Sequence, residues 1–424
     1  MEDKYFFPQR WLTIVITSPY EVEDEASKIG LLLSSGAADL VHIRKPSWTA
    51  AQVAGLLADI PLAYHRRLVL HDHYELQNYF TELKGIQYNS RNAHPDIEPW
   101  FNTETVHSLE ELSAAKAHDP EYVTLSPIYD SISKRGYTSA FDIGELSPVL
   151  RRSPLRVIAL GGVRPQNFIE LQRAGFSGAA LLGYVWNDFW SAIGQLIKYK
   201  KLVADFSFQF ITNPAEYVVE SVAQAQYALK GGCRWIQLRL KNADKQEFML
   251  AAQSVRLYCE DYGATMIIDD DVELAGLPDV GVHLGKEDMS AVDARHILGP
   301  DAIIGCTCNT AEDIERVIAQ GAADYIGLGP FRYTTTKKKL SPVLGLEGYA
   351  KILQDRKLRK LPIVAIGGIT LDDLPSLLNT GVDGVAVSGV LTREIEHKDG
   401  FSTYLQFQEE VANFAQAISN LINK

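Results

Sequence analysis

Polar side chains gather at the end of one short apolar run in the second half of the chain. The run CRWIQLRLK ends in Gln237, Arg239 and Lys241, which are spaced by two. That spacing places all three on one face of a β-strand, because successive side chains of a strand point to opposite sides. The alternation of these polar residues with leucines is also what an ordinary strand with one inward and one outward face would show. Three polar groups on one face of a buried strand need polar partners, however, so the pattern favours a functional face.

Acidic residues follow the next two apolar runs. Asp269, Asp270 and Asp271 end ATMIIDDD, and Asp288 follows VGVHLG. Carboxylates at adjacent strand tips suit a hard cation such as Mg²⁺, which takes few protein ligands and leaves positions for phosphate oxygens. We therefore expect Asp270 and Asp288 to bind Mg²⁺. Asp271 is better placed to cap the helix that follows it.

The last two apolar runs end in glycine-containing tips, Gly367-Gly368 and Ser388-Gly389. Glycines at these tips let backbone N–H groups approach a phosphate, although tight turns that require positive φ have the same composition. His283 and His296 are interpreted as ordinary structural or surface histidines.

A polar loop, FRYTTTKKKLSP, follows the sixth apolar run of this half. Thr334, Thr336 and Lys337 can reach an anion held between the acidic end and the glycine end. Lys338 and Lys339 are expected to be solvated, as polar residues in loops usually are.

These residues belong to a plan that occurs twice. Each half holds eight short strand-like runs, most of them separated by segments of helical periodicity such as PAEYVVESVAQAQYALKGG. Continuous apolar strands alternating with amphipathic helices indicate a parallel sheet covered by helices. Eight units predict a closed (β/α)8 barrel, whose functional groups lie at the C-terminal ends of the strands. A doubly wound open sheet is the alternative with the same alternation.

The halves also match in letters. HIRKP corresponds to QLRLK, LHDHYEL to IDDDVEL, TVHSLEEL to TCNTAEDI, SPIYDSISK to GPFRYTTTK, and VIALGGV to VAIGGI. The sequence therefore predicts an α/β protein of two tandem TIM barrels, residues 1–203 and 206–424, joined near KYKKLVAD.

Composition limits the classes of partner. The net charge of −12 over 424 residues argues against nucleic acid, but a local site for an anionic small molecule can oppose the global sign. No apolar run approaches the roughly 20 residues that span a bilayer, and the start MEDKYFFPQRW lacks the order of a secretory signal. The four cysteines show neither zinc spacing nor a disulfide framework. We expect a cytoplasmic protein with small-molecule partners and no membrane partner.

Six motifs of the second half occur in the order and spacing of thiamine-phosphate synthase: QLRLK, IIDDDVELA, GVHLGKEDM, GPFRYTTTK, VAIGGI and GVAVSG. The resemblance covers residues 206–424. It implies a (β/α)8 barrel that joins hydroxymethylpyrimidine diphosphate to a thiazole phosphate and releases pyrophosphate. The implied roles are Mg²⁺ at Asp270 and Asp288, the diphosphate at Arg239 and Lys241, the pyrimidine near Gln237, the pyrophosphate at Lys337, and the thiazole phosphate at Thr334, Thr336, Gly368 and Ser388.

Two positions depart from that family. Asp269 stands where the family usually has Asn, so it can tighten Mg²⁺ binding or repel the diphosphate. GCTCNT replaces a segment that typically carries Ser and His. Thr307 still offers a hydroxyl there, beside Asn309, so activity is compatible with the change.

The first half departs further. Asp72 is retained, but the second carboxylate position reads Asn92, and HIRKP lacks the Gln and the aligned Lys. The expected phosphate end survives as Ser131, Ser133, Lys134, Gly161 and Gly162. With His107 it resembles the TenI-like thiazole tautomerases of the same superfamily, whose barrel binds a thiazole phosphate and uses a histidine for proton transfer.

A degenerate barrel kept for packing or dimerisation, with His107 capping the next helix, is the alternative for the first half. Leu182, where the second half has Ser388, favours degeneracy.

Other classes remain open for the whole chain. An aldolase or isomerase needs a Schiff-base lysine, and Lys241 is the strand-borne candidate. A non-catalytic sensor of thiazole or thiamine phosphate is the second alternative. A homo-oligomer is compatible with barrels of this kind.

Overall fold

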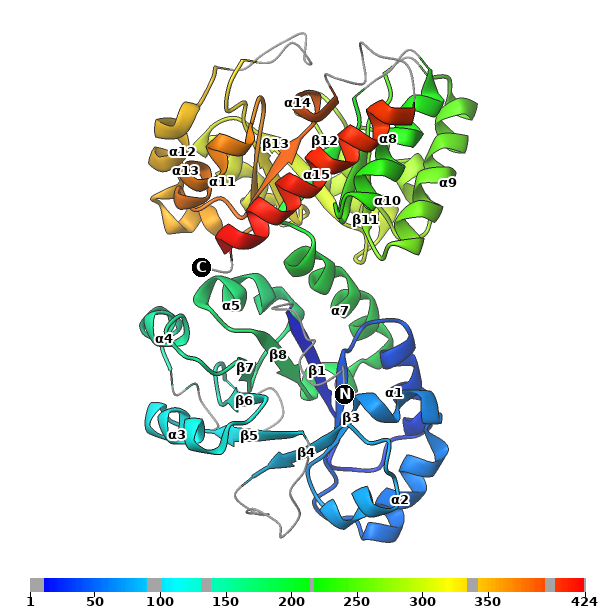
Figure 1. Cartoon of the computed structure of the whole chain (residues 1–424), viewed down its shortest axis with the longest axis vertical. Coiled ribbons are helices and arrows are strands. Elements are labelled where there is room, and N and C mark those ends of the chain that lie inside the picture. Colours follow the sequence, from blue (N-terminus) through cyan, green and yellow to red (C-terminus); the bar gives the residue numbers. More distant parts are fainter. Residues whose placement is uncertain are drawn as a thin grey trace. The chain divides into compact units, whose positions relative to one another are not determined.

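Strand pairing closes each half of the chain into its own barrel (Figure 1). The computed structural model describes residues 11–89, 101–130, 139, 141–213, 217–241, 243–333, 342–392 and 401–422, with side chains from residue 403 onward in the last range. The chain divides into two units, Met1–Val203 and Ala204–Lys424. In each unit the first strand pairs in parallel with both the second and the eighth. The prediction of two tandem barrels is confirmed, and the open doubly wound sheet is wrong.

The first unit alternates strands and helices in chain order. Its strands are β1 (Leu12–Ile16), β2 (Leu40–Ile43), β3 (Leu68–Leu70), β4 (Gly85–Tyr88), β5 (Asn102–Val106), β6 (Tyr122–Leu125), β7 (Val157–Leu160) and β8 (Gly178–Leu181). Its helices are α1 (Glu25–Ser34), α2 (Ala50–Asp59), α3 (Leu109–Ala114), α4 (Ile143–Leu150), α5 (Phe168–Ala174), α6 (Gly183–Asn187) and α7 (Phe189–Ala204), with 3₁₀ turns η1 (Leu62–Arg67), η2 (Tyr74–Asn78), η3 (Ala115–His118) and η4 (Pro165–Asn167). Most of KYKKLVAD, the predicted junction, belongs to α7.

The second unit repeats the order. Its strands are β9 (Phe208–Ile211), β10 (Trp235–Leu238), β11 (Thr265–Asp269), β12 (Val280–Leu284), β13 (Ile304–Cys308), β14 (Tyr325–Leu328), β15 (Ile363–Ile366) and β16 (Gly384–Val387). Its helices are α8 (Val218–Lys230), α9 (Lys245–Asp261), α10 (Ala291–Leu298), α11 (Ala311–Gln320), α12 (Gly345–Leu353), α13 (Leu374–Asn379), α14 (Gly389–Thr392) and α15 (Phe401–Ile422), with 3₁₀ turns η5 (Leu274–Gly276), η6 (Arg356–Arg359) and η7 (Leu371–Asp373). Helix α15 packs beside α8.

Burial explains why the strands are near-continuous apolar runs. Strands β1, β10 and β14 are buried along their whole length, since helices cover one face and the barrel interior the other. Within the part of the chain that the structure describes, no helix is long and apolar enough to cross a membrane.

Glycines inside two strands make room for ring side chains in the second barrel. A Cβ on Gly305 would lie 2.1 Å from the ring of Tyr325 and 2.6 Å from Nδ1 of His283. A Cβ on Gly327 would lie 3.0 Å from the His283 ring. These close approaches allow a polar pair of rings to fill the barrel centre, and they explain glycine in strands that otherwise favour branched side chains.

A buried ion pair holds the loop after β2 in the first unit. Lys45 Nζ donates to Glu25 Oε2 at 2.6 Å and to the carbonyl of Tyr20 at 2.8 Å, and it lies 4.4 Å from the ring centre of Trp48. The two charged side chains are 0% and 4% exposed. Burial raises the pKa of Glu25 and lowers the pKa of Lys45, and their mutual hydrogen bond opposes both shifts.

Removing one partner of this pair leaves a buried charge. We expect Lys45→Met to lower the free energy of unfolding of the first unit by about 3–5 kcal/mol, and Lys45→Met with Glu25→Leu to recover most of that loss. Urea unfolding of the full chain measures both. Equal losses in the single and double variants would contradict the interpretation.

Candidate active sites at the two barrel mouths

One carboxylate joins the tips of β10 and β11 in the second barrel. Gln237 Nε2 donates to Asp269 Oδ1 at 2.5 Å, and Arg239 Nε lies 3.0 Å from Asp269 Oδ2. The three side chains are largely buried, with Arg239 12% and Asp269 14% exposed. Asp269 therefore holds both Gln237 and Arg239 by direct contacts. Lys241, predicted to point with them, is exposed beyond the strand end.

The orientation of the Gln237 amide follows from this contact. An ionised carboxylate only accepts hydrogen bonds, so the NH₂ group must face Asp269. Oε1 of Gln237 is then the atom turned away from Asp269, and it is buried without a hydrogen-bond partner among the described residues. A buried acceptor left unsatisfied costs free energy, so a ligand that donates a hydrogen bond at this point is favoured.

The two carboxylates predicted to hold Mg²⁺ are both exposed at neighbouring strand tips. Asp270 follows β11 with φ 68°, and Asp288 follows β12 and accepts the N–H of Gly285 at 2.7 Å through Oδ2. Among the described residues, no group of three or more His, Cys, Asp or Glu side chains forms a ready cage. Two exposed carboxylates still fit Mg²⁺, which binds through one or two carboxylates, water and substrate phosphates. Asp271 accepts the N–H of Leu274 at 3.0 Å, as expected of a cap.

A hydrogen-bonded chain inside the barrel ends at Thr307. Gln209 Nε2 donates to Tyr325 Oη at 3.5 Å, Tyr325 Oη lies 3.0 Å from His283 Nδ1, and His283 Nε2 lies 3.0 Å from Thr307 Oγ1. Burial raises the pKa of Tyr325, so the phenol keeps its proton. The amide of Gln209 donates to Tyr325, and the directions of the two bonds made by His283 depend on its tautomer.

His283 is buried in the barrel centre, as a structural histidine would be, and its bond to Thr307 connects it to a candidate site residue. The glycines at 305 and 327 were a signal of its position, because a glycine inside a strand often marks a close approach by another group. His296 is exposed on α10, as expected.

The glycine-containing tips of β15 and β16, which we call the glycine end of the second mouth, lie beside a cis Gly329–Pro330 peptide. Gly367 and Gly368 have φ of 105° and 67°, and a Cβ on Gly367 would lie 2.9 Å from Cβ of Pro330. The turn interpretation therefore accounts for both glycines, and the exposed backbone remains available to a phosphate. Oγ of Ser388 is buried without a partner among the described residues, and Gly389 begins α14.

Arg332 fixes the start of the polar loop. Its guanidinium pairs with Asp373 and donates to the carbonyl of Gly368 at 3.0 Å. Thr334, Thr336 and Lys337 themselves lie outside the described residues.

A buried carboxylate braces the segment that carries Asp288. Asp313 pairs with Lys286 of that segment, with Arg316 at 2.6 Å, and with the N–H of Asn309 at 3.0 Å. Burial alone raises the pKa of Asp313, but these donors outweigh it and lower the pKa to about 2. The brace links the tips of β12 and β13.

The mouth of the first barrel contains a cavity of about 620 Å³. Its lining includes Arg44, His71, His107, Leu182 and the pair Gly161-Gly162. The two glycines have φ of 92° and 67°, as their counterparts do. Ser131, Ser133, Lys134 and Asn92 lie outside the described residues.

His107 does not cap the following helix. Ser108 is the N-cap of α3, and its side chain accepts the N–H of Glu111 at 3.1 Å. His107 is exposed, and its Nδ1 bonds to the carbonyl of Ser126 at 2.9 Å. The capping alternative for His107 is therefore wrong.

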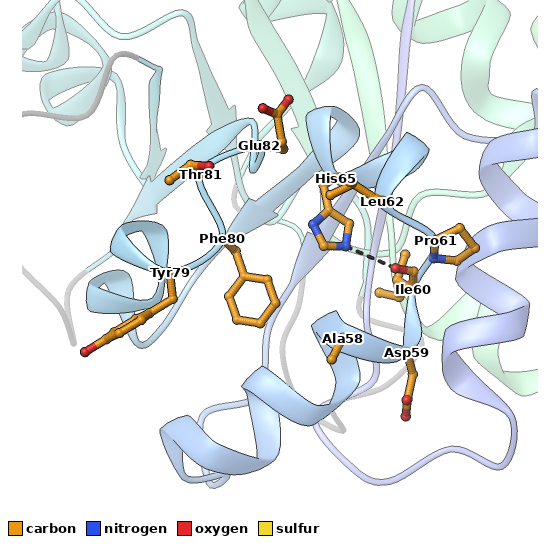
Figure 2. Close-up of a pocket in the computed structure, with 10 residues that line it drawn as sticks. All are labelled: Ala58, Asp59, Ile60, Pro61, Leu62, His65, Tyr79, Phe80, Thr81 and Glu82. Atoms are coloured by element: carbon orange, nitrogen blue, oxygen red, sulfur yellow. Dashed lines mark hydrogen bonds between the residues drawn. The ribbon is translucent and has the colours of Figure 1, made fainter.

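A further cavity of about 500 Å³ lies on the first unit (Figure 2). Its lining comes from the end of α2 and from η1, which precede β3, and from residues 79–82, which precede β4. The cavity therefore lies toward the N-terminal ends of those two strands. His65 Nε2 bonds to the carbonyls of Leu57 and Ile60, both at 3.1 Å. The N-terminal face of such barrels serves stability, and no residue predicted to do chemistry lines this cavity.

Fold and site together define a duplicated (β/α)8 barrel with chemically different mouths. The chain belongs to the thiamine monophosphate synthase family, whose model matches residues 13–185 and 208–391. Both units therefore belong to the family.

Relatives of known name are about the length of one unit. The chain is 53% identical over 188 residues to the thiamine-phosphate synthase of Phocaeicola vulgatus, covering 44% of this chain and 89% of that one. It is 50% identical over 190 residues to the thiamine-phosphate synthase of Bacteroides thetaiotaomicron, covering 44% and 90%. A solved thiamine phosphate pyrophosphorylase from Pyrococcus furiosus is 31% identical, covers 51% of this chain and 97% of its own, and has a TM-score of 0.42.

The brace at Asp313 predicts a pH-dependent stability. Because its pKa of about 2 lies below the ordinary 3.8, the carboxylate stabilises the fold above that value and loses the contribution as pH falls toward 2. We expect Asp313→Asn to cost about 1 kcal/mol near neutral pH, a figure reduced for the partial exposure of its cationic partners.

Urea unfolding of wild type and variant from pH 6 down to pH 3 measures this difference. The gap should narrow as the pH falls. A gap that is constant with pH would contradict the ionic origin, and Asp293→Asn on exposed α10 serves as the control.

Proposed function

We propose that the second unit, residues 206–424, is the synthase barrel of the chain. It joins hydroxymethylpyrimidine diphosphate to hydroxyethylthiazole phosphate and releases pyrophosphate. Family membership and relatives named thiamine-phosphate synthase support this transferase activity. The observation that carries the assignment to this unit is the Gln237–Asp269–Arg239 cluster beside Asp270 and Asp288.

The reaction needs charge stabilisation rather than a covalent nucleophile. The C–O bond to the diphosphate breaks, and its electron pair leaves with pyrophosphate. The remaining pyrimidine cation is stabilised by its amino group, and the thiazole nitrogen lone pair forms the new C–N bond. Arg239 and Lys241 stabilise the leaving diphosphate. The reaction also needs a site that holds the two rings close and excludes water. Lys337 is assigned to the pyrophosphate by the resemblance.

Mg²⁺ at Asp270 and Asp288 would neutralise the diphosphate oxygens as a Lewis acid. The residues' own contribution is to present two carboxylates on adjacent tips, with the Asp313–Lys286 brace holding one of them. Asp269 is engaged by Gln237 and Arg239, so it is assigned to orientation rather than to the metal.

Gln237 is assigned to the pyrimidine. Its amide is oriented by Asp269, so that Oε1 accepts from the amino group of the ring. Thr307, which is hydrogen-bonded to His283, is assigned to contact the reacting centre through its hydroxyl. The amino group that stabilises the pyrimidine cation then lies next to Oε1 of Gln237, which accepts its hydrogen bond.

The thiazole phosphate is assigned to the other end of the mouth. Ser388 contributes a buried hydroxyl without a described partner, and Gly367, Gly368 and Gly389 leave the backbone accessible. Thr334 and Thr336 complete this end in the proposal.

The first unit is proposed to bind a phosphorylated thiazole and to move a proton on it. The specific observation in favour is the cavity of about 620 Å³ at its mouth, which has room for a small phosphorylated ligand. The comparisons give no support to the sensor alternative. Four cysteines that form no disulfide suit the cytoplasm, which we propose as the compartment.

Loss of either metal carboxylate tests the synthase. We expect Asp270→Ala or Asp288→Ala to reduce single-turnover formation of thiamine phosphate by the full chain at least about 100-fold, because the leaving charge loses its cation. Wild type treated with a chelator should fall equally. Asp271→Ala removes only a cap, so it should cost about 1 kcal/mol of stability while the rate stays near wild type. Full activity of Asp270→Ala with Mg²⁺ would overturn the proposal.

The orienting role of Asp269 predicts a split between kinetic parameters. Asp269→Ala releases the Gln237 amide to rotate, so the KM for the pyrimidine diphosphate should rise about tenfold, the equivalent of about 1.4 kcal/mol. The KM for the thiazole phosphate should not change, since that ligand lies at the other end. Steady-state kinetics with each substrate varied measures this, and a lower KM for the diphosphate would instead mean that Asp269 repels it.

A further inference from the structure

The cavity toward the N-terminal ends of β3 and β4 has no part in the proposed activities (Figure 2). Its volume of about 500 Å³ is enough for a small organic molecule. Leu62 and Tyr79, which line it, are 67% and 80% exposed. Ile60 and Phe80 add apolar surface beside them. A hollow with such a lining favours a ligand with an apolar body, because binding removes these side chains from water.

A buried imidazole also lines the cavity. His65 is 4% exposed, and its Nε2 lies 3.1 Å from the carbonyl oxygens of Leu57 and Ile60. Because a carbonyl oxygen only accepts hydrogen bonds, Nε2 carries the proton and Nδ1 of the neutral ring is an acceptor. Nδ1 is buried without a hydrogen-bond partner among the described residues. Figure 2 shows Nε2 on the side of Ile60 and the other ring nitrogen on the side of Phe80.

The unsatisfied acceptor defines one feature of the ligand. A buried acceptor without a donor costs free energy, so a ligand that donates a hydrogen bond to Nδ1 is favoured. A water molecule can also donate to this atom, but it leaves Leu62 and Tyr79 as exposed as before. A ligand that combines an N–H donor with an apolar body satisfies both parts of the cavity.

The charges around the cavity favour a cation. The cavity lies at the C-terminal end of α2, where the helix carbonyls carry partial negative charge. The last turn of α2 contains no basic residue, and it ends in Asp59, which lines the cavity. Glu82, another lining residue, is 2.6 Å from Arg66, so that pair adds little net charge. The helix end and Asp59 together make the local potential negative.

Aromatic rings beside the acceptor favour a flat cation. The ring centres of His65 and Phe80 are 5.9 Å apart, with their planes tilted by 50°. The faces of phenylalanine and tyrosine rings attract cations, and a flat ligand packs well against them. Phe80 and Tyr79 therefore suit a ligand that is both planar and positively charged.

A phosphorylated ligand does not fit this chemistry. None of the described residues that line the cavity is a lysine or an arginine. A phosphate group would therefore meet the negative end of α2 and Asp59 without a cationic partner. The cavity thus selects against the class of ligand that is proposed for the barrel mouths.

We propose that this cavity is a binding site for a planar aromatic cation that carries an N–H donor, the class to which amidinium ions and protonated aminopyrimidines belong. The N–H donates to Nδ1 of His65, the ring packs against Phe80, and the positive charge lies near Asp59 and the end of α2. The site lies away from the mouth of the first barrel and does not depend on the proposed activities. A ligand that binds the folded unit there stabilises it.

Three probes of one shape and different charge test the proposal. Benzamidine is a cation at neutral pH, benzamide is neutral and benzoate is an anion. Each is titrated against the full wild-type chain at pH 7, and ligand-observed NMR gives the dissociation constant. We expect benzamidine to bind with a dissociation constant at or below about 1 mM, as a well-fitted ligand of this size does. Benzamide should bind at least about tenfold more weakly, and benzoate more weakly still.

Two variants separate the hydrogen bond from the shape of the cavity. His65→Gln keeps a donor for the carbonyls of Leu57 and Ile60 but removes Nδ1, so the affinity for benzamidine should fall at least about tenfold. Ala58→Phe, at an exposed position of α2 that lines the cavity, fills the hollow and should have the same effect. Urea unfolding of each variant shows whether the fold is retained, and Ala58→Phe decides the matter if His65→Gln does not fold.

A third variant tests the charge. Asp59→Lys should weaken benzamidine binding at least about tenfold, although the midpoint of urea unfolding should not fall, because a cation suits the C-terminal end of a helix. Glu23→Lys makes the same change of charge on the exposed loop after β1, and should alter the affinity less than about twofold.

The opposite results overturn the proposal. Benzoate binding as tightly as benzamidine excludes a cation site. Benzamidine binding that is unchanged in folded Ala58→Phe places the probe elsewhere on the chain. A loss in Glu23→Lys as large as that in Asp59→Lys reduces the effect to general charge attraction. The titrations measure binding alone, so they are independent of whether the second unit forms thiamine phosphate.

Discussion

Closure of each parallel sheet is the constraint on which both sites depend. Pairing of β1 with β8, and of β9 with β16, brings the C-terminal ends of eight strands to one rim. Groups more than a hundred residues apart in the chain then face the same space, as Arg239 and Ser388 do in the proposed synthase. Because every strand is buried between helices and interior, the polar groups are confined to the barrel centre and the rim.

The barrel centre is not purely apolar, because buried hydrogen-bonded side chains connect it to residues at the rim. A buried tyrosine near the start of the sixth strand anchors a polar chain in each unit, Tyr325 through His283 to Thr307 and Tyr122 through His42 to His71. The two chains reach different strand tips from equivalent starting points. Hydrogen bonds within such a buried network restrain its side chains, so each network positions the group at its end.

Asp269 has two contacts at the second mouth, one that offsets its charge and one that orients a neighbouring amide. A carboxylate beside a diphosphate site is unfavourable on charge alone. Its contact with Arg239 offsets that charge, and its contact with Gln237 sets the direction of an amide. In the proposed synthase, the exposed Asp270 and Asp288 are the carboxylates that would bind Mg²⁺, and Asp269 is the one that orients its neighbours.

The sequence by itself determined the two barrels, their strands and the placement of most candidate residues, because apolar runs and amphipathic helices recur with a fixed period and because strand ends must share a rim. The cap role of Asp271 followed from local chemistry in the same way. Tertiary structure alone decided which side chains touch. The Gln237–Asp269 and His42–His71 contacts join residues on different strands, whose register no local pattern reports. His107 was a candidate in the sequence, but only the fold shows that its Nδ1 bonds to the carbonyl of Ser126.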